Sequence, residues 1–352
     1  MAAKKAREAK FVETPPTLPE WQRLYQAAMR LKELAPWEWM EEDDVFGVQD
    51  PETGDLNFVS VMGSLGEHVA VAVYLGPQAL YSFWDLHEGG PSEAPERILE
   101  IPQLQASFED RSLLGEEDIG VIRQLGLKFR GRQAWPLFRS YRPGFCPWFL
   151  EANEARLLAT ALEQTVDVAA RFLEAPSLLE DWEGDQYLVR VPRQESGGLA
   201  WEDRVVDVPA PAPLPIEIRI AAETMQGFQS LGRGGAAVEV DLFMMPTPVR
   251  EQGRPFFPYM LLVVEPQSGL VLGSELLSPE PSLEAMWGSV PAALLEKLVQ
   301  VGFAPREVRV RSGLLQQLLQ PPAGALGLKV KQMDALPALD AARESLMGFL
   351  CR

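Results

Sequence analysis

The sequence of 352 residues contains few of the side chains that most often carry enzyme chemistry, with two cysteines and two histidines in all. Cys146 and Cys351 lie too far apart to form a metal-binding or redox motif, and such sparse cysteine is typical of proteins in a reducing compartment. His68 and His87 have no second ligand at the spacing of a zinc site. The sequence also has no GxSxG, Walker, HExxH or CxxC motif, so it indicates no enzyme class and no cofactor.

Long apolar runs and positive charge are scarce as well. No stretch approaches the roughly 18 apolar residues of a membrane-spanning helix, and the N-terminus has no signal-peptide core, so we expect a cytoplasmic protein with no membrane partner. Lys and Arg number 32 against 50 Asp and Glu, which gives a net charge of −18. This excess opposes general binding of nucleic acid, so a polyanion would need a local basic patch.

Turn-rich segments divide the chain into three predicted parts. Residues 1–19 combine several lysines with three prolines and no apolar periodicity, which predicts a flexible tail. Proline and alanine alternate over 209–213, as is typical of a linker, so we place a domain boundary near Pro209. We therefore expect an N-terminal α+β domain over 20–209 and a C-terminal α/β domain over 210–352.

The N-terminal part has the patterns of a mixed α+β domain. Apolar residues at helical spacing and period-two alternation follow one another along the chain, separated by Gly- and Pro-rich turns. The predicted helices cover 21–34, 116–125 and 151–173, with a short one around residue 80. The predicted strands cover 45–49, 58–62, 69–75, 98–108, 134–141, 186–191 and 204–208.

The C-terminal part shows the clearest element order. Apolar and charged residues alternate over 238–244, the period of a half-buried strand, and helical spacing over 283–301 predicts a long helix. Pro291 is expected to kink that helix or split it in two. The remaining predictions are strands over 216–220, 258–264, 270–277, 307–311 and 328–333, and helices over 313–319 and 338–350.

Three strands, a helix, a strand, a helix, a strand and a helix is an order that resembles the ribonuclease H-like fold of nucleases, integrases and transposases. The resemblance implies a mixed five-stranded sheet and, in members that cut nucleic acid, two metal ions held between carboxylates. Asp241 stands at the first-strand position of such a set, and Glu284 with Asp340 or Glu344 could complete it. Arg311 stands where a further acid is expected, which argues against a metal site. The pattern then favours Asp241 as a solvated residue on the polar face of its strand.

A second resemblance rests on short runs spread along the chain. They are a tryptophan-rich opening, the strand FGVQ at 46–49, the turn PETG at 51–54 and the run FFPY at 256–259. Together they resemble a family of uncharacterised bacterial proteins that pair two domains of unknown function. This resemblance covers nearly the whole chain and implies no catalytic residues.

One segment departs from the overall acidity. Between Asp118 and Glu151 the chain has no carboxylate, and cations are interleaved with aromatic residues. Sites for single-stranded nucleic acid use this combination, because cations neutralise phosphates and rings stack on bases. In the alternative, which the net charge favours, the rings are core and the arginines neutralise the protein's own acids. The candidate residues are Lys128, Arg130, Arg132, Arg139 and Arg142.

A smaller basic feature follows from strand geometry. Arg309 and Arg311 alternate with valines on one predicted strand, and Lys329 and Lys331 alternate with apolar residues on another. If these strands pair, four cations share one sheet face, which would be open as a candidate ligand site or would dock against the acidic N-terminal half, and the pattern favours docking.

The sequence leaves two function classes open. It favours a non-catalytic binding or scaffold protein with a degenerate ribonuclease H-like domain, for which a protein partner is possible. The alternative is a divalent-metal nuclease or another protein that processes nucleic acid.

Overall fold

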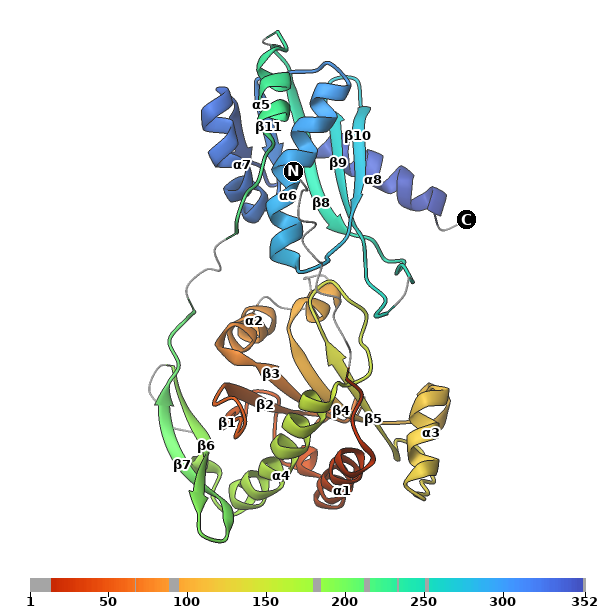
Figure 1. Ribbon diagram of the computed structural model, residues 1–352, viewed down its shortest axis with the longest axis vertical. Coiled ribbons are helices and arrows are strands. Elements are labelled where there is room, and N and C mark those ends of the chain that lie inside the picture. Colours follow the sequence, from red (N-terminus) through yellow and green to blue (C-terminus); the bar gives the residue numbers. More distant parts are fainter. Residues whose placement is uncertain are drawn as a thin grey trace, which may run out of the picture. The chain divides into compact units, whose positions relative to one another are not determined.

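The computed structural model describes residues 14–66, 68–88, 95–179, 185–211, 216–232, 234–250 and 253–350. Residues 1–13 of the predicted tail lie outside these ranges. Within them, the chain forms eight α-helices and two mixed sheets of seven and five strands (Figure 1). It divides into two compact units, the N-terminal unit (Met1–Arg142 with Pro147–Pro211) and the C-terminal unit (Pro143–Cys146 with Ala212–Arg352). No helix in the described ranges combines the length and apolarity needed to cross a membrane.

The N-terminal unit is built on a seven-stranded sheet. Its strands are β1 (Phe46–Gln49), β2 (Leu56–Met62), β3 (Ala70–Leu75), β4 (Gln103–Glu109), β5 (Trp135–Tyr141), β6 (Gln186–Glu195) and β7 (Gly198–Asp207). Their order is β5-β4-β3-β2-β1-β6-β7, and neighbours are antiparallel except β1 and β6, which are parallel. Gly47 of β1 permits close approach to β6, because a Cβ there would lie 2.7 Å from Cγ2 of Val189.

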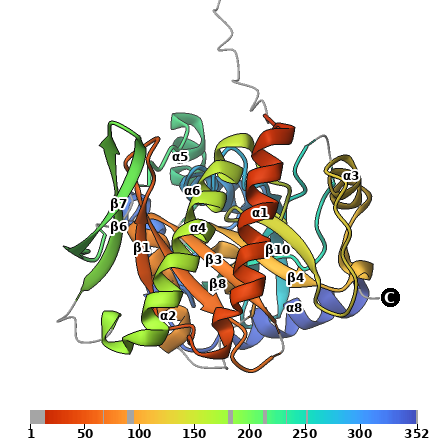
Figure 2. The ribbon, with the colours of Figure 1, turned by 90° about the horizontal axis from the view of Figure 1, so that it is seen from below.

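Helices cover both faces of this sheet. They are α1 (Leu18–Leu34), α2 (Gly76–Glu88), α3 (Glu116–Gln124) and α4 (Ala152–Glu174), with 3-10 helices at Pro36–Glu38, Pro95–Glu100, Arg111–Leu113 and Pro176–Leu178. Because successive strand residues point to opposite faces, Val59 and Val61 share a core with α1 and α4, whereas Phe58 shares one with α2. Figure 2 shows α1 and α4 running side by side across the sheet.

Helix α1 begins at Leu18 and not at Trp21. The backbone N–H and the hydroxyl of Thr17 both donate to the Glu20 carboxylate, at 2.6 and 2.7 Å, and cap the helix start. The N–H of Ala152 donates to the carbonyl of Thr14 at 2.8 Å, which fixes the chain before the cap. The flexible tail predicted over 1–19 is therefore too long, because Thr14 and Thr17 are hydrogen-bonded and Leu18 and Pro19 lie in α1.

The C-terminal unit is built on a five-stranded sheet. Its strands are β8 (Ala237–Met244), β9 (Tyr259–Glu265), β10 (Leu270–Leu277), β11 (Glu307–Val310) and β12 (Lys329–Gln332). Their order is β10-β9-β8-β11-β12; the first three are antiparallel neighbours, and β11 is parallel to both β8 and β12. The predicted mixed five-stranded sheet is confirmed.

The helices of this unit also lie on both faces of their sheet. They are α5 (Ala222–Gln229), α6 (Leu283–Gln300), α7 (Gly313–Leu326) and α8 (Pro337–Leu350). Val238 and Val240 of β8 belong to the core formed with α5, α6 and α7, whereas Phe243 belongs to the core formed with α8. Asp241 alternates in phase with Phe243 and therefore points toward the α8 face.

Several predicted elements need correction. The chain from Ile216 to Ile220 forms no strand, and the short helix α5 was not predicted because its apolar pattern is brief and interrupted by a glycine. Pro291 does not split α6, and α7 continues through Pro321 and Pro322, because burial of their apolar faces outweighs the hydrogen bonds that proline removes. The strand predicted over 98–108 is a 3-10 turn followed by β4.

Candidate functional site

In the C-terminal unit, two carboxylates and one guanidinium meet on the α8 face of the sheet. Asp241 lies on β8, Arg311 directly follows β11, and Asp340 lies in the first turn of α8. Glu239, which is 3% exposed, accepts a hydrogen bond from the N–H of Leu339 at 2.8 Å and so anchors the start of α8. We call Asp241, Arg311 and Asp340 the arginine–carboxylate cluster.

One guanidinium bridges both acids of this cluster. Nη1 of Arg311 lies 3.7 Å from Oδ2 of Asp241, and Nη2 donates to Oδ1 of Asp340 at 2.5 Å. The hydrogen bond to Asp340 raises the pKa of Arg311, so the side chain stays cationic. The space between the two carboxylates, where a metal ion would have to bind, is therefore held by a permanent positive charge.

The solvated position expected for Asp241 is wrong. Its residue exposure is 6%, because the strand face on which it lies is covered by α8. Burial raises the pKa of Asp241, and the positive charge of Arg311 opposes that rise without cancelling it.

The other two acids of the predicted set do not join the cluster. Glu284 lies in the first turn of α6, whose buried residues pack on the opposite sheet face, and Glu344 is exposed on α8. Within the described residues, no three His, Cys, Asp or Glu side chains could together hold a metal ion. The structure thus brings together Asp241 and Asp340 only, and places Arg311 between them.

The four predicted cations do share a sheet face, but acids on the same strands accompany them. Register pairs Arg309 with Lys331 and with Glu239, and Glu307 accepts from Arg309 at 2.9 Å and lies 2.6 Å from Lys331. Lys329 is exposed at the edge. Glu239 and Glu307 lie on the same sheet face as the cations. The alternation of residues along the strands already indicated this in the sequence.

In the N-terminal unit, two arginines of the basic aromatic segment bind the protein's own acids. Arg139 donates to both oxygens of Asp118, at 2.9 and 2.7 Å, and its guanidinium lies 4.9 Å from the ring centre of Phe149. Arg142 pairs with Glu151 at 2.5 Å and with Glu154 at 3.0 Å. Asp118 precedes the basic aromatic segment, and Glu151 and Glu154 follow it, so the segment itself contains no carboxylate.

Two of those acids also cap helices. Asp118 accepts from the N–H of Gly115 at 2.9 Å at the start of α3, and Glu154 accepts from the N–H of Glu151 at 2.8 Å at the start of α4. Arg139 and Arg142 therefore tie both helix starts to the end of β5. This geometry explains their position without a phosphate.

The remaining cations lie apart from these pairs. Lys128, Arg130 and Arg132 are exposed between α3 and β5, and none forms an ion pair with any residue that the structure describes. Phe129 stacks on Tyr25 at 6.1 Å, and Phe138 meets the same ring edge-on at 5.0 Å, so these rings are held in the core. Binding of a polyanion by the exposed cations stays a prediction.

The structure also shows a cavity that the sequence did not indicate. It measures about 350 Å³ and lies between the chain before α1, the first turns of α1 and α3, β5 and the chain before α4. Its lining comes from segments far apart in the sequence, so no local pattern marks it. We call it the aromatic cavity; its lining includes Trp21, Tyr25, Phe138, Trp148 and Phe149, with Glu117, Asp118 and Glu151.

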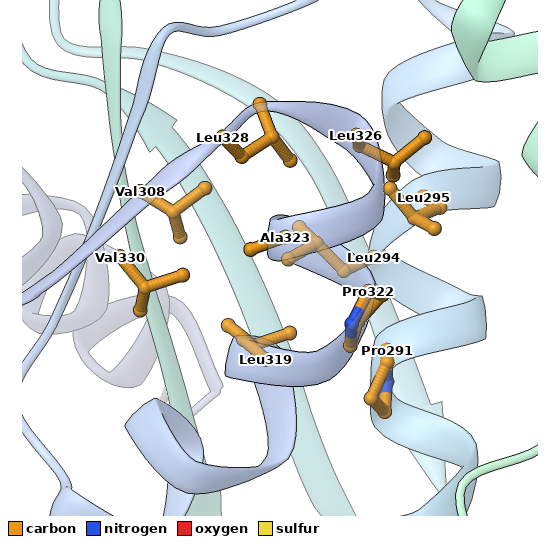
Figure 3. Close-up of a pocket in the computed structure, with 10 residues that line it drawn as sticks. All are labelled: Pro291, Leu294, Leu295, Val308, Leu319, Pro322, Ala323, Leu326, Leu328 and Val330. Atoms are coloured by element: carbon orange, nitrogen blue, oxygen red, sulfur yellow. The ribbon is translucent and has the colours of Figure 1, made fainter.

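A smaller space in the C-terminal unit is a packing gap. It holds about 10 Å³ between α6, α7, β11 and β12, and Figure 3 shows Pro291 and Pro322 among its apolar side chains. This volume is at most that of one water molecule, and the walls offer no polar partner. The gap is therefore no ligand site.

Comparison with known proteins gives two matches. Residues 21–190 match the family model of a domain of unknown function (DUF7309), and residues 224–347 match that of another domain of unknown function (DUF6930). No curated protein matches the chain. The two matches support an uncharacterised two-domain family, and neither description assigns an activity.

Proposed function

We propose that this protein is a non-catalytic binding protein whose C-terminal unit is a degenerate ribonuclease H-like domain. The strand order β10-β9-β8-β11-β12, with α6, α7 and α8 following their strands, supports the fold assignment. The sparse cysteine of the chain supports a place in a reducing compartment such as the cytoplasm.

The observation that carries the proposal is the guanidinium of Arg311 between Asp241 and Asp340. Two-metal catalysis needs several carboxylates around two cations about 3.5–4 Å apart, which stabilise the attacking and leaving oxygens. Here two acids already share one fixed cation, and a divalent ion between them would meet repulsion from the guanidinium. The residues present do not fit a two-metal centre.

A nuclease assay tests this proposal. We expect the purified full-length chain to leave single- and double-stranded DNA and RNA intact with Mg²⁺ or Mn²⁺. Asp241→Asn is the diagnostic variant, and Asp334→Asn, an exposed acid of the same unit, is its control. Cleavage that is lost in Asp241→Asn and kept in Asp334→Asn would show that the unit is a metal-dependent nuclease.

A further inference from the structure

The aromatic cavity has the size and walls of a small-ligand site. Pockets for small molecules usually measure about 300–1,000 Å³ and are lined mainly by apolar and aromatic groups with a few polar ones. This cavity measures about 350 Å³, and five aromatic rings line it. Trp21 and Phe138 lie 6.2 Å apart in contact with the same core, so the walls are held by packing.

One wall of the cavity carries a tyrosine hydroxyl that has no hydrogen-bond partner among the described residues. Tyr25 is 2% exposed and lines the cavity, and its hydroxyl forms no hydrogen bond with any described residue. A tyrosine hydroxyl can both donate and accept a hydrogen bond, so this one can bond a polar atom of a molecule that fills the cavity. Burial, together with the nearby charge of Asp118, raises the pKa of Tyr25, so the phenol stays neutral and able to donate.

The charged residues that line the cavity all have the same sign. Asp118 and Glu151 are neutralised by Arg139 and Arg142, which are not part of the lining. Glu117 is exposed at the rim and has no ion pair among the described residues. Carboxylates and the negative faces of aromatic rings both attract cations and repel anions.

We infer that the aromatic cavity binds a small organic molecule that carries an ammonium group on an apolar or aromatic body. The body fills the space between the rings, the ammonium group lies near Glu117, and the Tyr25 hydroxyl bonds a polar atom of the ligand. This inference names a ligand class for the binding function proposed above and rests on it. It also places the specificity of this region in its acids and rings, and not in the arginines.

Calorimetric titration of the full-length protein tests the inference with two probes of similar size and opposite charge. We expect 2-phenylethylamine to bind with a one-to-one stoichiometry, and 3-phenylpropionate to bind at least about tenfold more weakly, a difference of about 1.4 kcal/mol. Absence of saturable 2-phenylethylamine binding, or equal binding of the two probes, would overturn the inference.

Two conservative variants locate the site. Glu117→Gln should weaken 2-phenylethylamine binding about two- to fivefold, as expected for a solvent-exposed charge, and Tyr25→Phe about two- to tenfold through the lost hydrogen bond. Glu116→Gln, its neighbour on α3 outside the lining, is the matched control and should bind like the parent. Equal weakening in Glu116→Gln and Glu117→Gln would contradict the assignment. Circular dichroism verifies the fold of each variant, and the nuclease assay separately tests the non-catalytic proposal.

Discussion

The two sheets each carry an arginine from the strand that runs parallel to their first strand, and the two arginines are used differently. Arg190 lies on β6 beside β1, and Arg311 directly follows β11 beside β8. The side chain of Arg190 is 9% exposed, against 37% for Arg311. In one unit the cation is buried, and in the other the cation is half-exposed.

The acids show the opposite distribution. Arg190 bonds Gln164 at 3.0 Å and pairs with Asp203 and Asp167, whose side chains are 34% and 46% exposed. Arg311 pairs with Asp241, whose side chain is 8% exposed, and with Asp340, whose side chain is 45% exposed. The cost of burial therefore falls on the cation in the N-terminal unit and on one of the two carboxylates, Asp241, in the C-terminal unit. The sequence alone does not show which partner of an ion pair is buried.

Replacing either arginine should have the largest effect on stability, and the size of the loss should differ between the two units. Arg311→Met leaves the buried Asp241 without its paired cation, and we expect the free energy of opening of β8 and β11 to fall by about 3–5 kcal/mol. Arg190→Met leaves acids that water can reach, so we expect a loss of about 1–2 kcal/mol in β1 and β6. Hydrogen exchange of these strands at pH 7 measures both values, and a larger loss in Arg190→Met would contradict the comparison.

Replacing the acids should have smaller effects on stability. These effects should depend on pH in opposite directions for Asp203 and Asp241. Burial alone would raise the pKa of Asp203, but hydrogen bonds from Arg190 and Arg171 lower it below 3.8. Its stabilising contribution is therefore present above pH 3.8 and is lost as the pH falls through the lowered pKa. Asp203→Asn should cost about 1–2 kcal/mol at pH 7 and less in acid.

For Asp241 the contribution to stability changes with pH in the opposite direction. Its pKa in the folded protein is raised above 3.8, so its contribution favours folding below that pH and is lost as the pH rises through the raised pKa. Asp241→Asn should therefore change stability by less than about 1 kcal/mol at pH 7 and should lose stability relative to the parent on acidification. Scanning calorimetry between pH 3 and 7 compares the two variants, and parallel pH profiles would refute the assignment.

Local turn chemistry was predictable because it depends on few residues. Residues 50–54 and 265–269 form the same turn, in which an acidic side chain accepts backbone N–H groups and a glycine takes a φ of 81° or 70°. The turn joins β1 to β2 in one unit and β9 to β10 in the other. The similarity is therefore one of local chemistry, and it marks different positions in the two sheets.

Long-range features were not predictable to the same degree. The alternation over β8 indicated a strand and its phase, but burial of Asp241 depends on α8, about 100 residues later. Similarly, the rings of the basic segment were visible in sequence, but the aromatic cavity needs Tyr25 and Glu117 from other elements. The acids that neutralise Arg139 and Arg142, by contrast, lie at the ends of the basic segment and were visible in the sequence.

Binding of Mn²⁺ tests most directly the claim that Arg311 takes the metal's place. Electron paramagnetic resonance measures free Mn²⁺ in the presence of the full-length protein and of an Asp241→Asn/Asp340→Asn variant. Any weak binding by the other carboxylates of this acidic chain is common to both proteins. We predict identical titrations, with no site specific to the parent. A stoichiometric site in the parent that is absent from the variant would contradict the account.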